Sequence, residues 1–405
     1  GPCDYFFFGR SPFFQSLQTR VCRCFVTLFF MWAKQLQILA VIVNYYSAPL
    51  TLRAVRSVLD SKLVGPLRVV VVDNGGGASE SEILRRGLPS DAFFLASPEN
   101  IGFGGACNLA FERFPSEALL LLNPDGRLLP GALAQLQETL FSRDRVGAVS
   151  PRIFWDNGLR FQLPPSLPPA LFEFDSLLHA FGPGALFSRI TGGLWRRHSL
   201  KIWEAQAPVS VRNLSGGAVL LKSSAVKKAG GLFDPRFFLY FEDADLFLRL
   251  KKAGFSLLME PRAAAVHHYD QCGKENLAEK RRHMERSHQL FVHKHRKPWK
   301  SGLKGLERFF NGEAPPINGI RANQFLRDFV KDMPVPSHLQ KKWLFELSPN
   351  PNLVPAAGCL GAGAQVHFPE ECWDLLSPGR YFFRLGGATS FRPRLSPVTT
   401  FEKPL

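Results

Sequence analysis

Residues 67–77 read Leu-Arg-Val-Val-Val-Val-Asp-Asn-Gly-Gly-Gly, an apolar β-branched run that ends in a carboxylate and a glycine-rich turn. A similar run, Leu36–Val43, precedes it, and the helical pattern of Pro49–Asp60 lies between the two. Strands that are apolar throughout and separated by helices indicate a parallel sheet covered on both faces. The sequence therefore predicts an α/β fold, a mostly parallel sheet flanked by helices.

The same alternation continues along the chain. The Leu163–Trp203 stretch interrupts it and reads as an irregular insertion or a pair of short amphipathic helices. The remaining expected helices are Ser79–Gly87, Ala106–Phe114, Ala225–Ala229 and Asp245–Ala253, and the remaining expected strands are Ala92–Ala96, Ala118–Leu122, Val146–Ile153, Val211–Lys222 and Ser256–Met259.

The chain is expected to divide into three parts. Residues 1–35 are expected to be a leader or a disordered extension. Residues 36–300 are expected to form a single α/β domain that ends in a basic helical segment. Residues 301–405 contain Pro, Gly and short apolar runs such as Trp343–Leu347 and Tyr381–Leu385. They predict a small β-rich domain or an irregular appendage.

The charge of the chain predicts an anionic partner. Among its 405 residues the formal net charge is +16, and the segment Lys274–Lys304 holds ten Lys or Arg against three acids. Nucleic acid, an anionic membrane surface or a phosphorylated ligand could each be this partner. The alternative is that the basic segment is a charged helix that simply faces solvent. The seven cysteines are scattered and odd in number, which indicates a reducing compartment.

Polar residues stand where three predicted strands end: Asn44, Asp73 and Asp125. Ligands of open α/β sheets bind beyond the carboxyl ends of the strands. Asp73 could accept the imide N–H of a pyrimidine, or it could simply open a glycine turn. Asp125, in Asn123-Pro-Asp-Gly126, could bridge Mg²⁺ or Mn²⁺ to a diphosphate, although this sequence also suits a turn.

Two further groups are candidates for ligand binding. The stretch Asn100-Ile-Gly102-Phe-Gly-Gly enters a helix whose backbone N–H groups could bind an anion, but by itself it favours a tight loop. His267 could complete a metal shell with Asp125, since imidazole is a ligand for Mn²⁺. The adjacent His268 is given no role.

The sequence Phe237-Phe-Leu-Tyr-Phe-Glu-Asp-Ala-Asp245 places three carboxylates behind an aromatic run. Because burying an unpaired carboxylate costs several kcal/mol, such a cluster indicates either a helix N-terminus or a reactive site. In the reactive interpretation Asp243 takes a proton from an acceptor hydroxyl and Glu242 orients the acceptor. Asp245 is expected to cap the helix.

Taken in order, these motifs resemble those of family 2 inverting glycosyltransferases with the GT-A fold, in the bacterial rhamnosyltransferase-like branch. The resemblance covers about Leu36 to Trp299. Its motifs are Val41-Ile-Val-Asn-Tyr45, Val71-Val-Asp-Asn-Gly75, Glu99-Asn-Ile-Gly-Phe103, Leu121-Leu-Asn-Pro-Asp125, Ser215-Gly-Gly-Ala218, Phe237-Phe-Leu-Tyr-Phe-Glu-Asp-Ala-Asp-Leu246 and Val266-His-His268.

The resemblance implies a role for each motif. Asp73 would contact the nucleobase, Asn123 and Asp125 would stand at the metal motif, Asp243 would be the base and His267 a metal ligand. Asn44, Asn100 and Gly102 would belong to the donor site. Residues 36–150 would form the half that binds the nucleotide sugar, and residues 151–300 the acceptor half. Asn123 departs from the fuller motif, which has an acid there.

The implied activity is transfer of a sugar, rhamnose among the candidates, from a dTDP-, UDP- or GDP-sugar to a glycan or lipid-linked acceptor, with inversion. It would use Mg²⁺ or Mn²⁺ and serve cell-envelope polysaccharide synthesis in the cytoplasm, at the inner face of the membrane. The basic segment would then meet an anionic leaflet or a diphosphate-linked acceptor. The alternative is a non-catalytic protein that binds sugar nucleotides or nucleic acid, and nucleic acid is the less expected partner.

Overall fold

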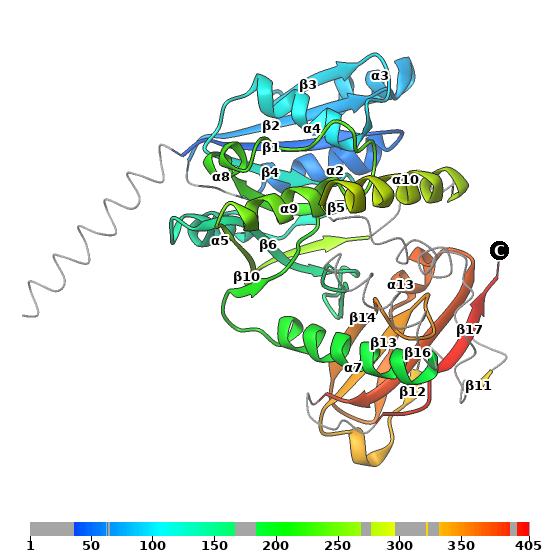
Figure 1. The fold of residues 1–405 in the computed structure, drawn as a ribbon. Coiled ribbons are helices and arrows are strands. Elements are labelled where there is room, and N and C mark those ends of the chain that lie inside the picture. The colour runs from blue at the N-terminus through cyan, green and yellow to red at the C-terminus, as the bar shows by residue number, and fades with distance from the viewer. Residues whose placement is uncertain are drawn as a thin grey trace, which may run out of the picture.

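The computed structural model describes residues 36–61, 63, 65–166, 184–268, 277–295, 321–322, 332–388 and 395–404. The leader or extension predicted at 1–35 lies outside the described residues, as do both ends of the basic segment, 274–276 and 296–304. An α/β part and a smaller β-rich part lie one above the other (Figure 1).

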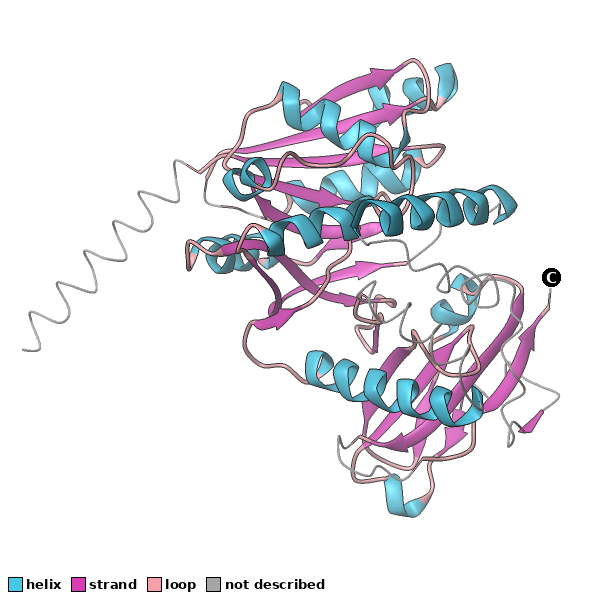
Figure 2. Cartoon of the chain, viewed as in Figure 1, coloured by secondary structure: helices cyan, strands magenta, loops and turns pink. Residues whose placement is uncertain are grey.

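Residues 38–122 form the predicted parallel sheet. Its strand order is β3-β2-β1-β4, and every neighbouring pair is parallel. Helices follow the first three strands and cover the sheet (Figure 2). The strands are β1 (Ile38–Asn44), β2 (Leu67–Asn74), β3 (Ala92–Ser97) and β4 (Ala118–Leu122), and the helices are α2 (Ala48–Leu59), α3 (Gly77–Gly87) and α4 (Gly102–Arg113).

The continuous apolar runs are explained by burial on both faces of this sheet. In β2, Val70 and Val72 pack into one hydrophobic cluster, whereas Val69 and Val71 pack into the cluster on the opposite face. Side chains alternate across a strand, so a strand covered on both faces needs apolar residues at every position. This confirms the predicted fold class.

Beyond β4 the sheet becomes mixed. Strand β9 (Ala218–Lys222) runs antiparallel to both β4 and β6 (Val146–Phe154), and β10 (Ser256–His267) runs parallel to β6. The short strand β5 (Gly126–Leu128) pairs with the end of β10. The helices of this part are α5 (Ala132–Phe141), α8 (Ser223–Lys228), α9 (Glu242–Lys252) and α10 (Leu277–His295).

Two elements of the α/β part differ from those that the sequence pattern predicts. The predicted strand Val211–Lys222 is divided into β8 (Val209–Val211) and β9, because Gly216 and Gly217 between them bond to other segments. Helix α5 lies in a stretch where the pattern predicts no element, and its buried side chains include Leu133 and Leu136.

The C-terminal strands form a β-rich layer, with the predicted strands at Trp343–Leu347 and Tyr381–Leu385 lying inside β13 and β16. The layer joins the main sheet through β7 (Phe161–Gln162), which pairs with β14 and β6. Its elements are β12 (Asp332–Pro334), β13 (Trp343–Ser348), β14 (Ala357–Gly361), β15 (Gln365–His367), α13 (Glu370–Leu375), β16 (Gly379–Gly387) and β17 (Thr399–Lys403), with β11 (Arg321–Ala322) beside β17.

Helix α7 (Gly184–Trp203) packs on this C-terminal layer (Figure 1), and Ile202 near its end also belongs to a hydrophobic cluster of the α/β part. The buried Arg196 forms an ion pair with Glu346 of β13, and the Trp203 ring lies against Gly358 of β14. An irregular insertion or a pair of short helices is expected over Leu163–Trp203. Residues 184–203 of this stretch form one 20-residue helix, and residues 167–183 lie outside the described residues. The domain boundary at residue 300 stays a prediction. Helix α7, which precedes residue 300, packs on strands that follow it.

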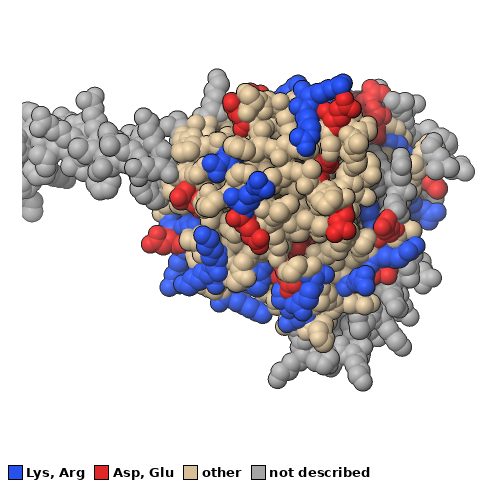
Figure 3. Space-filling model, turned by 90° about the horizontal axis from the view of Figure 1, so that it is seen from above, with Lys and Arg blue, Asp and Glu red and all other residues tan. Residues whose placement is uncertain are grey.

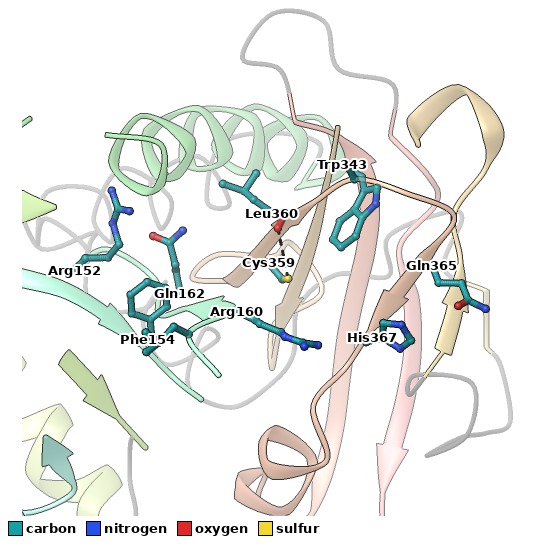
Figure 4. A pocket seen from close by; sticks show the side chains of 11 residues that line it. Arg152, Phe154, Arg160, Gln162, Trp343, Cys359, Leu360, Gln365 and His367 are labelled. Carbon is teal, nitrogen blue, oxygen red and sulfur yellow. Dashed lines mark hydrogen bonds between the residues drawn. The ribbon is translucent and has the colours of Figure 1, made fainter. Parts of the chain in front are cut away.

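A cavity of about 550 Å³ lies where the two parts meet. Arg152, Arg160 and Gln162 line it from the side of β6 and β7, whereas Gln365 and His367 line it from β15 (Figure 4). The cavity lining contains none of the site residues that the sequence predicts.

Candidate active site

The end of β1 is held against the end of β2 by a closed hydrogen-bond network. Asn44 is fully buried, and its amide donates to Asp73 Oδ1 at 3.1 Å and to Glu80 Oε2 at 3.0 Å. Its amide oxygen accepts from Thr51 at 2.8 Å and from Ser47 at 3.2 Å. Because an amide side chain offers two donors and two lone pairs, the bonding capacity of Asn44 is used within the protein.

Asp73 lies at the centre of this network and is 2% exposed. Its second oxygen, Oδ2, accepts a short hydrogen bond from Ser81 of α3. Glu80, the residue before Ser81, also accepts from the Ala48 N–H at 3.0 Å and so satisfies an otherwise orphan donor at the start of α2. Asn44 of β1 and Ser81 of α3 therefore fix the direction of the Asp73 carboxylate.

The loop before α4 is tied to the end of β2 by a pair of asparagines. Asn74 donates to Asn100 Oδ1 at 2.9 Å and accepts from the Ile101 N–H, while the Gly102 N–H donates to Asn100. The next N–H, of Phe103, donates to the Phe238 carbonyl at 3.1 Å. The protein itself uses these N–H groups at the helix entrance, which supports the tight-loop interpretation over anion binding.

Gly102 is required at the contact between this loop and the segment before α9. Its φ is +77°, and an added Cβ would lie 2.2 Å from the Phe238 carbonyl oxygen. No other residue type can combine this conformation with such a close approach. Gly102 thus brings the predicted donor half into contact with the segment that carries the carboxylate cluster.

Asp125 and His267 meet at the start of β5 and the end of β10. His267 Nε2 lies 2.9 Å from Asp125 Oδ1, and both residues are buried. The pairing of β10 with β5 sets His267 opposite Gly126, which places the two side chains together. Asn123 lies beside them, since a Cβ at Gly217 would fall 2.9 Å from the His267 ring and 3.2 Å from the Asn123 amide nitrogen.

This pair could hold a divalent cation only with help from a ligand. Among the described residues no group of three or more His, Cys, Asp or Glu is placed to hold a metal ion. A carboxylate and an imidazole that lie next to each other are nevertheless ligand types that suit Mg²⁺ or Mn²⁺ when diphosphate oxygens and water complete the shell. Asp125 and His267 are the residues that fit this role.

The Gly216-Gly217 turn connects this pair to the carboxylate cluster. The Gly217 carbonyl accepts from the Asn123 N–H at 2.8 Å, and the Gly216 N–H donates to Asp243 Oδ2 at 3.0 Å. A Cβ at Gly216 would touch Asp243 at 3.4 Å. The predicted catalytic residue therefore lies one tight turn away from the predicted metal pair.

Glu242 and Asp243 open α9 and are costly to ionise. The pKa of Glu242 is raised to about 8, first by burial and then by the neighbouring Asp243 charge. Among the described residues Glu242 Oε2 has no hydrogen-bond partner. Burial also raises the pKa of Asp243, although the N–H groups of Gly216 and Ala244 stabilise its charged form.

The backbone before this pair is in an unusual conformation. Tyr240 and Phe241 both have positive φ, 69° and 63°, which costs a non-glycine residue on the order of 1 kcal/mol or more. Such conformations persist where the surroundings enforce them. Here they turn the chain sharply, so that α9 begins at Glu242.

Asp245 differs from Glu242 and Asp243 because two cations and an imidazole contact its carboxylate. It is fully buried and contacts Arg249 at 2.8 Å, Lys294 at 2.7 Å and His295 at 2.6 Å. Burial alone would raise its pKa, but these three partners lower it below the usual value. The expected capping role is wrong, because the Asp245 side chain bonds to Arg249 and α10 instead of to a backbone N–H.

Part of the basic segment therefore faces inward. Ser287 of α10 donates to the Leu239 carbonyl, and Phe241 packs on both His288 and Phe291. Burial lowers the pKa of His288 to about 4, so this histidine is neutral near pH 7.

No helix within the described ranges is long and apolar enough to cross a bilayer. On the face seen in Figure 3, Lys and Arg are interspersed with Asp and Glu.

Residues 39–199 match the profile of the family described as Glycosyl transferase family 2. The chain contains a family 2 glycosyltransferase domain. Together with the α/β sheet, this match confirms the predicted family and enzyme class. The family 2 domain carries Asn44, Asp73, Asn100, Gly102, Asn123 and Asp125 within the matched range, whereas Glu242, Asp243 and His267 lie after it.

Two curated relatives of the family 2 domain are also glycosyltransferases. An N-acetylglucosaminyl-diphospho-decaprenol L-rhamnosyltransferase of Mycobacterium tuberculosis is 26% identical over 258 residues, which is 59% of this chain and 79% of the relative. The low-salt glycan biosynthesis hexosyltransferase Agl10 of Haloferax volcanii is 25% identical over 213 residues, 52% of this chain and 61% of the relative.

Two solved structures are similar to the chain at low identity. The mannosyltransferase PcManGT from Pyrobaculum calidifontis, in complex with GDP-Man and Mn²⁺, has a TM-score of 0.44 and 17% identity over 72% of this chain and 79% of that one. GalNAc-T7 with UDP, GalNAc and Mn²⁺ has a TM-score of 0.45 and 15% identity over 69% of this chain and 50% of that one.

Several residues that shape the site are not marked by any sequence pattern. Glu80 and Ser81 orient Asn44 and Asp73, and Lys294 and His295 contact Asp245. Glu371 of α13 lies 3.2 Å from His268 Nε2 and accepts from the Asn157 N–H. His268, for which no role is expected from the sequence, follows β10 directly and contacts the C-terminal layer through Glu371.

Proposed function

We propose that this enzyme transfers a sugar from a nucleotide diphosphate donor to a glycan or lipid-linked acceptor with inversion at the anomeric carbon. The observation that carries the proposal is the position of Asp243. Its carboxylate is held by the Gly216 N–H, and the next residue, Gly217, lies against His267 of the Asp125–His267 pair. A base and a diphosphate site are therefore separated by a single turn.

In the proposed reaction the acceptor hydroxyl oxygen attacks the anomeric carbon of the donor sugar. The new C–O bond forms as the bond from that carbon to the diphosphate oxygen breaks, and the hydroxyl proton passes to the Asp243 carboxylate. The nucleotide diphosphate leaves with the electron pair. Attack opposite to the leaving group inverts the anomeric configuration.

The donor would occupy the ends of β1, β2 and β4. Asp73 would accept from the nucleobase, and Asn123, Asp125 and His267 would lie at the diphosphate. A divalent cation bound by Asp125 and His267 would supply charge stabilisation for the departing diphosphate. Asn44 acts through Asp73, because its amide is fully engaged within the protein. Asn100 and Gly102 shape the loop beside the donor.

Glu242 would act beside the base in its protonated form. Its raised pKa keeps the carboxyl largely neutral near pH 7. A neutral carboxyl can donate a hydrogen bond to an acceptor oxygen, and it adds no second negative charge next to Asp243. The Asp243 carboxylate is thereby easier to form in its buried position.

The relative that acts on a diphospho-decaprenol acceptor supports a lipid-linked acceptor and a role in cell-envelope polysaccharide synthesis. The enzyme would then work in the cytoplasm, at the inner face of the membrane. Rhamnose is the sugar that this relative's name suggests. The family match favours such an enzyme over the non-catalytic protein that binds sugar nucleotides or nucleic acid.

The test is a donor and acceptor screen with the full chain. The protein is incubated with Mn²⁺ or Mg²⁺, a dTDP-, UDP- or GDP-sugar, and N-acetylglucosaminyl-diphospho-polyprenol, and release of nucleotide diphosphate is measured. We expect release that depends on the acceptor, and a product with inverted anomeric configuration by nuclear magnetic resonance. Release without any glycosylated product, or a product with retained configuration, would contradict the proposal.

A further inference from the structure

A second pocket, of about 270 Å³, opens between α10 and the segment that precedes α9. We name it the α10 pocket. Three of its residues, His283, Arg286 and Leu290, follow the helical spacing that places them on one face of α10. The lining residues are Arg236, Phe238, His283, Arg286, Ser287 and Leu290.

The α10 pocket lies close to the proposed base. The Phe238 carbonyl accepts from the Phe103 N–H at 3.1 Å. The Phe103 ring in turn comes within 3.6 Å of where a Gly216 Cβ would lie, and the Gly216 N–H holds Asp243. A chain of contacts through Phe103 and Gly216 therefore connects the pocket wall to the Asp243 carboxylate.

The charges around the pocket favour an anion. Arg236 is oriented by a bidentate contact with Asp234, and Asp234 is also paired with Lys294 at 2.7 Å. Arg286 is exposed and has no acidic partner among the described residues. His283 stacks on Phe238 with ring centroids 4.7 Å apart, so its ring is held at the pocket. Two guanidinium groups and an imidazole line this volume. Arg236 and His283 each have an acidic neighbour, Asp234 and Glu279, so Arg286 is the group whose charge is left for an anion.

We propose that the α10 pocket binds the diphosphate of a polyprenyl-linked acceptor, an inference that rests on the proposed function. The donor diphosphate already has a place at Asp125 and His267, so a second phosphate site on the Asp243 side fits the acceptor. Guanidinium groups suit phosphate oxygens, and Phe238 and Leu290 give an apolar wall for the first isoprene unit. The acceptor sugar would then extend from the pocket toward Asp243.

The inference is tested first by binding, without turnover. The affinity of farnesyl diphosphate is measured in the presence of saturating nucleotide diphosphate, which occupies the donor site. We expect Arg286→Ala to raise Kd about tenfold or more, because a charge-assisted hydrogen bond to phosphate is lost. The control, Arg281→Ala, removes an exposed arginine of the same helix outside the pocket and should leave Kd unchanged. An equal Kd for both variants would overturn the inference.

A kinetic comparison separates this inference from the proposed function. N-acetylglucosaminyl-diphospho-farnesol and octyl N-acetylglucosaminide share a sugar, and only the first carries a diphosphate. We expect Arg286→Ala to lower the ratio of their kcat/KM values about tenfold. If the wild-type enzyme used both acceptors equally well, the pocket would have no role although the transfer reaction stood. If it used neither while farnesyl diphosphate still bound the pocket, the proposed function would fail and the binding site would stand.

Membrane headgroups are the other source of phosphate. Sedimentation with phosphatidylglycerol vesicles that lack the acceptor measures this attraction. Equal vesicle binding by wild type and Arg286→Ala supports recognition of the acceptor diphosphate. A loss of vesicle binding together with an unchanged farnesyl diphosphate Kd would assign Arg286 to the membrane surface and overturn the inference.

Discussion

Asp73 and Glu242 are both buried carboxylates, 2% and 6% exposed, yet their surroundings differ. On the proposed donor side, Asp73 accepts from Asn44 and Ser81, and Glu80 closes the network. On the proposed acceptor side, Glu242 Oε2 has no partner among the described residues, and burial raises the pKa of Glu242. The hydrogen bonds around Asp73 are complete within the protein, whereas those of Glu242 are not.

The acceptor side is nevertheless held rigidly, through Asp245. Two cations, Arg249 of α9 and Lys294 of α10, and the imidazole of His295 contact Asp245, two residues away from Asp243. One carboxylate of the cluster therefore connects α9 to α10, and the other two are the proposed reactive pair. The paired Asp245 anchors the helix that carries Glu242 and Asp243.

The largest expected effect comes from Asp243→Asn. The amide keeps the size of the side chain but cannot take a proton, so kcat should fall about 10²- to 10⁴-fold. Donor binding, measured by calorimetry with the nucleotide diphosphate, should change little, since Asp73 and the Asp125–His267 pair are intact. Turnover close to the wild-type rate would remove Asp243 as the base and break the distinction between the two sides.

The next largest effect should be on stability, from Asp245→Ala. Removing this carboxylate leaves Lys294 and Arg249 beside an empty buried site, which costs about 3–5 kcal/mol in the free energy of unfolding. Denaturant unfolding measures the change. The exposed Glu82–Arg86 pair is the control, and Glu82→Ala should cost less than about 1 kcal/mol. Equal losses in the two variants would show that burial of Asp245 has no special energetic role.

The lowered pKa of Asp245 also predicts how acid affects the protein. An acid whose folded-state pKa lies below its unfolded value stabilises the fold above the unfolded pKa, near 3.8, and loses this contribution as pH falls through the folded pKa. The Asp245→Ala variant should therefore lose less stability than wild type when the pH is lowered below about 4. Parallel stability curves in this range would contradict the ion-pair description.

The sequence predicted the two sides unequally well, for physical reasons. Strand ends are marked locally by a β-branched run that stops at a polar residue, so Asn44, Asp73 and Asp125 could be found. No local sequence pattern identifies partners such as Glu80 and His295. Glu80 is 36 residues from its partner Asn44, and His295 is 50 residues from its partner Asp245. The same reason explains why Asp245 reads as a helix cap in sequence and is an ion-pair centre in the fold.

A smaller effect, with a defined pH dependence, is expected for Glu242→Gln. The folded-state pKa of Glu242, about 8, lies above its unfolded value, so the folded protein binds the extra proton and wild-type stability falls as pH rises between about 4 and 8. Glutamine removes this cost and should stabilise the protein by about 1 kcal/mol or more at pH 8 and by less at pH 5. Unfolding at the two pH values measures the difference.

The activity of Glu242→Gln tests whether the protonated form of Glu242 is the active one. If the neutral carboxyl is the working form, the variant should retain more activity at pH 7 than Glu242→Ala, since glutamine also donates a hydrogen bond. A stability gain that is equal at pH 5 and pH 8 would show that Glu242 is not protonated in the fold.

The smallest effect is expected for Glu80→Ala, on the side that is already complete. Loss of this carboxylate leaves one amide hydrogen of Asn44 and the Ala48 N–H without their partner, which costs about 1–3 kcal/mol of stability. Because Asn44 still reaches Asp73, the donor Kd should rise less than about tenfold, with kcat unchanged. The matched control is Glu82→Ala on the same helix, two residues away and exposed. If donor Kd stayed at the wild-type value while stability fell, the network would serve the fold alone, and Asp73 would not need its support to bind the nucleotide.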